Sequence, residues 1–161
     1  MNKHYQIVII GGGTAGVTVA SRLLRKNQNL KEKIAIIDPA DHHYYQPLWT
    51  LVGAGVSSLK SSRKDMESVI PEGANWIKQA VSSFQPENNS VILGDNTVVY
   101  YDFLVVAPGL QINWSSIKGL KENIGKMVFA LTIHLTMLTK LGTKFLILNK
   151  EMPFLRIQTL L

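Results

Sequence analysis

The sequence predicts an α/β fold built around a parallel sheet, and three observations support this prediction. The apolar, largely β-branched residues 5–10 lead into the glycine-rich residues 11–16, and a helical pattern follows over residues 17–26. A second apolar run, residues 34–37, ends at an acidic residue, and a third, residues 103–106, ends in small residues. Short runs that are apolar at every position are typical of strands buried on both faces of a parallel sheet. With 161 residues, 46% of them hydrophobic, the chain is long enough for one core.

The first strand leads into a glycine turn that has the spacing of a dinucleotide-binding loop. Gly11 allows the chain to turn tightly off the strand, Gly13 leaves room for a pyrophosphate beside the backbone, and Gly16 allows the helix to pack close to the sheet. The free N–H groups and the dipole at the start of the helix favour bound phosphates. The alternative is a purely structural glycine turn. The strand before the turn and the helix after it favour nucleotide binding.

The second strand ends directly at Asp38, 25 residues after Gly13. A carboxylate at this position can accept hydrogen bonds from both hydroxyl groups of a ribose. The alternative is that Asp38 and Pro39 form only a turn. The position at a strand end and the spacing from the glycine turn favour the ribose ligand.

Residues 41–55 combine two adjacent histidines with several aromatic residues. His42 and His43 suggest a metal site, but neighbours in an extended chain point to opposite faces and no third ligand lies nearby in the sequence, so we expect no metal. The aromatic residues around Gln46 and Pro47 either form a rigid loop beside a flat ring system or belong to the core. Their composition is compatible with both interpretations.

The rest of the first 125 residues predicts a helix and several strands. In order, these are a surface helix over residues 62–70 with Arg63 and Lys64 on its solvated face, a strand over 74–81, a hairpin of 91–93 with 97–100, and a buried strand over 103–106. The hairpin is predicted to be a small antiparallel insertion in the parallel sheet. Small residues after the last strand, Ala107 and Gly109, allow the backbone to approach a ligand. We expect one edge of this sheet to be exposed.

Charge and composition exclude several classes of function. The net charge is +6, but residues 126–161 hold five of the 17 basic groups and one of the 11 acidic groups, so the predicted nucleotide-binding part is nearly neutral and we expect no nucleic-acid partner. The absence of cysteine excludes disulfides, thiolate metal sites and redox thiols. The longest uncharged run after residue 126 has 13 residues, fewer than the roughly 20 of a transmembrane helix. Because only four residues precede Tyr5, we expect no targeting segment before it.

The motifs taken together resemble a known family. The glycine turn, Asp38 and residues 101–109 resemble the FAD-binding half of the flavoprotein oxidoreductases that have two dinucleotide-binding domains, the pyridine nucleotide-disulfide oxidoreductase-like superfamily. Residues 43–55 and 69–78 are more specific, because they are similar to the mitochondrial type of sulfide:quinone oxidoreductase. The resemblance covers about residues 4–125 and spans several separated motifs.

This resemblance implies an incomplete Rossmann-like FAD-binding domain over residues 1–125. The cofactor contacts that it implies are FAD diphosphate on Gly11, Gly12, Gly13, Thr14, Ala15, Gly16 and Val17, adenosine ribose on Asp38, the flavin end on Gln46, adenine on the backbone of Val81, and close passage of the chain at Ala107 and Gly109. In the family, two cysteines near the flavin accept the sulfur of sulfide, and electrons pass through FAD to a quinone. This chain has no cysteine, so the resemblance implies no catalytic residue here.

The predicted function is therefore the N-terminal FAD-binding portion of a sulfide:quinone oxidoreductase-like flavoprotein, inactive as it stands. The resemblance implies a mitochondrial location and, in the intact family, peripheral association with the inner membrane. A stand-alone nucleotide-binding module and a non-functional fragment are the alternatives.

Residues 126–161 are predicted to be an aberrant, poorly ordered tail. If allowed codons for residues 152–161 are read from one base earlier, they can spell N-A-I-F-T-N-P-N-T-P, which is similar to the family segment just before its first catalytic cysteine. A frameshift near the codon of Lys126 accounts for this match. A divergent C-terminus produced by alternative splicing, or a genuine short paralogue, is the alternative, and sequencing of the transcript across this codon distinguishes them.

Overall fold

The computed structural model describes residues 3–123. The chain divides into two units, the first made of Met1–Tyr44 and Lys64–Leu110 and the second of Tyr45–Arg63 with the residues from Gln111 onward. The predicted break at residue 126 and the predicted tail lie outside the described residues.

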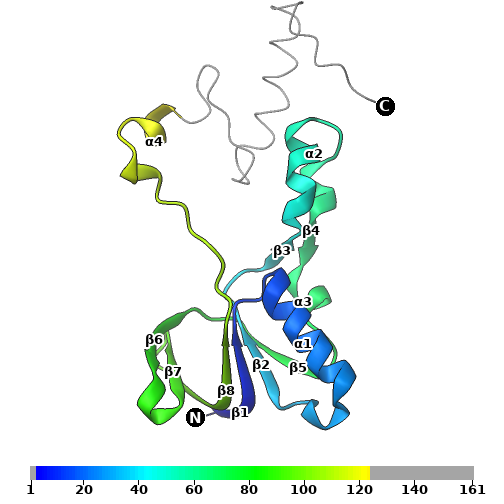
Figure 1. Ribbon diagram of the computed structural model, residues 1–161, viewed down its shortest axis with the longest axis vertical. Helices are drawn as coiled ribbons and strands as arrows, with labels where there is room; N and C mark the ends of the chain where they lie inside the picture. The colour runs from blue at the N-terminus through cyan, green and yellow to red at the C-terminus, as the bar shows by residue number, and fades with distance from the viewer. Residues whose placement is uncertain (1–2, 124–161) are drawn as a thin grey trace, which may run out of the picture. The chain divides into compact units, whose positions relative to one another are not determined.

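A six-stranded sheet forms the first unit, with the strand order β5-β2-β1-β8-β7-β6 (Figure 1). Its strands are β1 (Lys3–Ile10), β2 (Ile34–Ile37), β5 (Ala74–Ile77), β6 (Val81–Gln85), β7 (Ser90–Leu93) and β8 (Val98–Val106). Strands β5, β2, β1 and β8 are parallel, whereas β7 pairs antiparallel with both β8 and β6. The predicted α/β fold, a parallel sheet with an antiparallel insertion, is confirmed.

Two strand predictions were wrong in their boundaries. The segments 97–100 and 103–106 were expected as separate strands but form the single strand β8, which leaves the hairpin and continues beside β1. The segment 74–81 was expected as one strand but is divided between β5 and β6, on opposite edges of the sheet. The chain turns between them, where the N–H of Gln79 donates to the carbonyl of Ile77 at 2.9 Å. Residues 78–80, Lys-Gln-Ala, contain no glycine or proline that would indicate this turn.

The predicted helix over residues 62–70 was also wrong for most of its length. The chain forms the 3-10 turn η3 (Leu59–Ser62), then β4 (Arg63–Asp65), and only then α3 (Met66–Val69). Strand β4 pairs with β3 (His42–Tyr44) in a small second sheet, and the N–H of Met66 donates to the carbonyl of Asp41 at 2.8 Å. These long-range backbone hydrogen bonds override the local helical preference. Arg63 and Lys64 are exposed as expected, but on a strand.

Helix α1 (Thr14–Lys26) covers one face of the parallel strands, and the 3-10 turn η1 (Gln28–Leu30) follows it (Figure 1). The apolar residues on this face form one buried cluster, which consists of Ile7, Ile9, Ala20, Leu24, Leu30, Ile34 and Ile36. The opposite face carries a second cluster made of Val8, Ile10, Ala35, Ile37, Val91, Leu93, Val99 and Tyr101. Burial of both faces explains why β2 and the second half of β1, residues 7–10, are apolar at every position.

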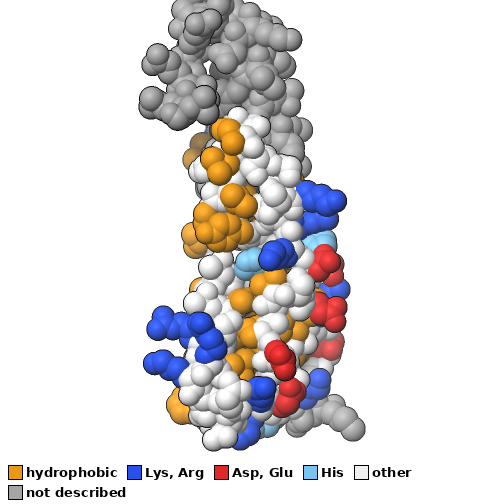
Figure 2. Space-filling view, turned by 90° about the vertical axis from the view of Figure 1, so that its right-hand side faces the viewer, with side chains coloured by type: hydrophobic (Ala, Val, Ile, Leu, Met, Phe, Trp, Pro, Cys, Tyr) orange, Lys and Arg blue, Asp and Glu red, His pale blue; other side chains and the backbone are white. Residues whose placement is uncertain are grey.

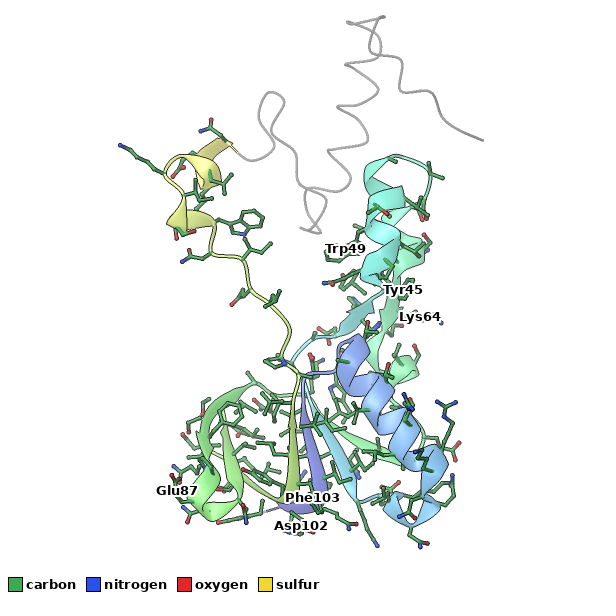
Figure 3. All side chains as sticks on the ribbon, viewed as in Figure 1. Tyr45, Trp49, Lys64, Glu87, Asp102 and Phe103 are labelled. Carbon is green, nitrogen blue, oxygen red and sulfur yellow. The ribbon has the colours of Figure 1, made fainter. Side chains whose placement is uncertain are left out.

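The far end of β8 is uncovered within the described residues. Strand β7 pairs only with Val98–Tyr100 of β8, so between residues 102 and 106 the side of β8 opposite β1 has no strand partner in the part that the structure describes. Phe103, which is labelled in Figure 3, is level with Ile7 of β1. Its side chain is 64% exposed, and that of Val106 is 56% exposed. Within residues 3–123, this part of β8 is therefore an open strand edge, although β8 is an interior strand in the order of the sheet.

The second unit is built from short turns and helices. Its elements are η2 (Gln46–Leu48), α2 (Trp49–Gly53), η3, η5 (Trp114–Ser116) and α4 (Leu120–Asn123). Hydrophobic side chains gather over α2 in Figure 2, and Tyr45, Leu51 and Val56 are exposed. Tyr45 is exposed, whereas Tyr44 and Trp49 are half-buried, so both interpretations of the aromatic loop stay open. Among the described residues, no helix is long and apolar enough to span a membrane.

Candidate nucleotide-binding site

The glycine turn between β1 and α1 has the backbone geometry that the sequence predicts. Gly11 has a φ of +99°, and a Cβ at this position would overlap the carbonyl oxygen of Ala107. A Cβ at Gly16 would overlap the carbonyl oxygen of Gly11 and lie 3.2 Å from Cγ2 of Ile9. Gly11 is therefore required for the turn and for close contact with the end of β8, and Gly16 for close packing of α1 on the sheet.

Gly13 differs from these two glycines because the space beside it is open. A Cβ built on Gly13 has no atom within 4 Å, and the residue has an ordinary φ of −70°. Gly13 is the N-cap of α1, which has no side-chain cap and no acidic residue in its first turn. The first N–H groups of a helix have no partner within the helix. Open space beside such donors fits an anionic diphosphate.

Asp38 lies against the glycine turn at the end of β2. Its Oδ2 accepts a hydrogen bond from the N–H of Gly12 at 2.6 Å, and its Oδ1 accepts one from the N–H of Ala40 at 2.8 Å. The bond from Ala40 closes a turn at Asp38 and Pro39, as the structural alternative predicts. The bond from Gly12 connects the end of β2 to the glycine loop. Each carboxylate oxygen has a further lone pair. The carboxylate is therefore fixed in place and still able to accept from ribose hydroxyls.

Two residues from the end of β5 support this corner, and sequence reasoning assigned no role to either. Trp76 donates from Nε1 to the carbonyl of Asp38 at 2.9 Å. Lys78 lies with Nζ 5.7 Å from the centroid of the Trp76 ring and forms an ion pair with Asp41. The hydrogen bond and charge of Lys78 lower the pKa of Asp41 below its ordinary value. The sequence could have placed both residues near Asp38, because the carboxyl ends of parallel strands lie at the same edge of a sheet.

Replacing Lys78 with methionine is expected to raise the pKa of Asp41 toward that of a free aspartate. A carboxyl group whose pKa is lowered by folding stabilises the protein above its unfolded pKa, and this contribution is lost as the pH falls through the folded pKa. K78M should therefore make stability less dependent on pH in the acid range. Carboxyl NMR titration measures the change, with Lys60→Met as the control. An Asp41 pKa that is unchanged in K78M would contradict the assignment.

The two adjacent histidines have different partners. His43 Nδ1 lies 3.1 Å from the carbonyl oxygen of Gly12, whereas His42 Nδ1 lies 3.2 Å from Oδ1 of Asp65. This agrees with the expectation that the two rings point to opposite faces of an extended segment. Among residues 3–123, no group of three or more potential ligands could hold a metal ion. The contact between His43 and the glycine loop was not predicted.

The remaining predicted cofactor residues are distributed over several elements. Thr14, Ala15 and Val17 are in the first turn of α1, and Val81 begins β6. The N–H of Ala107 donates to the carbonyl of Ile10 at 2.8 Å, and this places Ala107 beside the glycine turn. Gly109 has a φ of +76° and open space around it. Gln46 lies in the second unit, at the start of η2. Their contacts with a cofactor remain predictions.

Comparison with known families decides the classification of this fold. The sequence model of the family described as "Pyridine nucleotide-disulphide oxidoreductase" matches residues 5–144. The chain belongs to this family. The match includes β1, the glycine turn, Asp38 and β8, and it extends past residue 126. Assignment to this family agrees with the α/β fold and with the geometry of the glycine turn.

Within the family, the chain is similar to sulfide:quinone oxidoreductases. It is 52% identical over 121 residues to the mitochondrial sulfide:quinone oxidoreductase of Dictyostelium discoideum, an alignment that covers 75% of this chain and 26% of the relative. It is 40% identical over 120 residues to the mouse (Mus musculus) mitochondrial enzyme, covering 74% of this chain and 26% of the relative. The chain thus spans about a quarter of the length of these relatives. The resemblance inferred from the motifs is confirmed.

A solved structure shows the same fold. The sulfide:quinone oxidoreductase from Aquifex aeolicus matches with a TM-score of 0.72 at 21% sequence identity. The match covers 92% of this chain and 32% of that protein.

Proposed function

We propose that this chain is the FAD-binding portion of a sulfide:quinone oxidoreductase-like flavoprotein. The observation that carries the proposal is the open space beside Gly13 at the uncapped start of α1, next to the fixed carboxylate of Asp38. An anionic diphosphate fits the first feature, and a ribose fits the second. The similarity to sulfide:quinone oxidoreductases supports FAD as the dinucleotide.

The residues of this chain would bind and orient the cofactor. The turn from Gly11 to Gly16, with Thr14, Ala15 and Val17, would hold the diphosphate, and Asp38 would accept from the ribose hydroxyls. The backbone of Val81 would contact the adenine, Gln46 would lie near the flavin end, and Ala107 and Gly109 would allow close passage of the chain. FAD, when bound, supplies two-electron chemistry between sulfide and quinone, the reaction for which the relatives are named. The chain contains no cysteine to accept sulfur.

Titration of the purified chain with FAD tests the proposal. We expect one FAD per chain, quenching of flavin fluorescence, and an increase in unfolding free energy of about 2.7 kcal/mol at a FAD concentration of 100 times the Kd. Competition by NAD⁺ at equal concentration measures the preference for FAD. A folded chain that binds no FAD would overturn the proposal.

A second assay tests the expectation that the chain is inactive by itself. With sulfide and a soluble quinone analogue, we expect no quinone reduction above the rate with free FAD, because this chain has no thiol nucleophile. Sulfide-dependent quinone reduction by the purified chain would contradict this expectation.

For location, we propose the mitochondrion, with peripheral association at the inner membrane in the intact protein. The names of the relatives support the mitochondrial assignment, and imaging of a tagged chain tests it.

A further inference from the structure

We propose that His43 is a positioning residue for the anion-binding loop, which it orients through the carbonyl group of Gly12. The inference rests on the proposed function, because it concerns the same nucleotide site. His43 Nδ1 lies 3.1 Å from the carbonyl oxygen of Gly12, in a partly buried environment. A carbonyl oxygen only accepts hydrogen bonds, so Nδ1 must carry the proton and act as the donor.

Gly12 is held on both sides by groups from different strands. Its N–H donates to Oδ2 of Asp38 at the end of β2, and its carbonyl accepts from His43 on β3. The backbone that carries His43 is itself held in place, because β3 pairs with β4 and because the carbonyl of Asp41 accepts from the N–H of Met66 at 2.8 Å. The side chain of Met66 is buried and lies next to Gly12. The loop is thus anchored to two separate elements.

The hydrogen bond from His43 determines the direction of the next N–H group. A trans peptide is planar, so the carbonyl of Gly12 and the N–H of Gly13 point in opposite directions. Because the carbonyl of Gly12 points toward His43, the N–H of Gly13 points away from His43. Gly13 is also the residue whose Cβ position is open. His43 sets the orientation of a donor that is available to a phosphate.

Such an anchor is needed because three consecutive glycines offer the backbone many conformations. Glycine residues lose more conformational entropy on ordering than any other residue type. A loop that is already ordered before the ligand arrives does not lose this entropy on binding, so preorganisation increases affinity. His43 supplies part of that order in the free protein, before any nucleotide binds.

Substitution of His43 by asparagine and by leucine tests this role in the full chain. The amide nitrogen of asparagine can take the place of Nδ1, whereas leucine removes the donor. We expect His43→Leu to raise the Kd for FAD about tenfold, which corresponds to about 1.4 kcal/mol. We expect His43→Asn to stay within about threefold of the wild type, as should the matched control His42→Leu, whose imidazole faces Asp65 instead. An equal increase in the Kd for FAD in His43→Leu and His42→Leu would overturn the proposal.

NMR on the free protein provides a readout that does not depend on FAD. The imidazole nitrogens of wild-type His43 should report a protonated Nδ1, and the amide signal of Gly13 should shift in His43→Leu but remain near its original position in His43→Asn. If the wild type bound no FAD, the proposed function would fail, but these two signals would still decide the role of His43. If His43→Leu did not fold, His43→Asn and the wild-type tautomer would decide it. A wild-type ring protonated only at Nε2, or a Gly13 amide unchanged in a folded His43→Leu, would overturn the proposal.

Discussion

Replacement of Gly13 by alanine is expected to leave the fold intact and to weaken FAD binding about a hundredfold, which corresponds to about 2.7 kcal/mol. The new Cβ meets no protein atom within 4 Å and the φ of −70° suits any residue, so the free protein has room for it. The methyl group instead occupies the space that a diphosphate would enter. Loss of the glycine N-cap should reduce the unfolding free energy by only about 1 kcal/mol or less. Fluorescence titration with FAD and urea unfolding measure the two effects separately.

The matched variant Gly16→Ala adds the same methyl group three residues later and should have the opposite profile. Its Cβ overlaps the carbonyl oxygen of Gly11, a backbone atom that cannot move away without breaking the turn. We expect destabilisation of about 3 kcal/mol or more, with FAD affinity lost as a consequence of unfolding. A stable Gly16→Ala chain would contradict the packing role of this glycine. A Gly13→Ala chain that binds FAD like the wild type would place the diphosphate elsewhere.

Phe103→Lys is expected to reduce self-association of the chain about tenfold or more, which corresponds to about 1.4 kcal/mol or more. Phe103 is 64% exposed on the part of β8 that has no strand partner opposite β1 within residues 3–123. An open strand edge with exposed apolar side chains is a template for pairing with another copy, and a lysine on such an edge opposes this pairing. Light scattering over a series of protein concentrations measures the association.

The control for this experiment is Val56→Lys. Val56 is 70% exposed, like Phe103, but it lies in the second unit outside any strand. Loss of an exposed apolar side chain that does not lie on a strand edge should leave the association constant nearly unchanged. If both variants behaved alike, general surface hydrophobicity, and not the edge of β8, would be responsible.

The parallel half of the sheet was predictable because its strands are buried on both faces. Burial on two faces requires an uninterrupted apolar run, and residues 34–37 were predicted with the bounds that β2 has in the structure. The roles of Gly11 and Gly16 in the turn were predictable for a similar reason, because only glycine fits where a backbone carbonyl occupies the position of Cβ. The apolar run and the glycine spacing are local sequence patterns, although the carbonyl that a Cβ at Gly11 would meet belongs to the distant Ala107.

The errors occurred where long-range pairing determines the structure. Residues 63–65 are charged and flank helix-compatible residues, yet they form a strand because β3 offers them backbone partners. The division between β5 and β6 was missed because both are short and the turn between them contains no glycine or proline. The contact of His43 with Gly12 joins residues 31 positions apart. No local sequence pattern predicts contacts between residues so far apart in the chain.

The lack of a capping side chain on α1 also affects the motion of the free protein. Without a capping side chain, the first turn of the helix opens to solvent at a low free-energy cost, so the amides of Thr14, Ala15 and Gly16 should exchange their hydrogens quickly. Amides of the buried strands, such as that of Ile36, should exchange only through larger unfolding events. Nucleotide binding would protect the first turn and would change the buried strands only through the overall gain in stability. The helix therefore has its least protected amides at the place where a ligand can supply the protection.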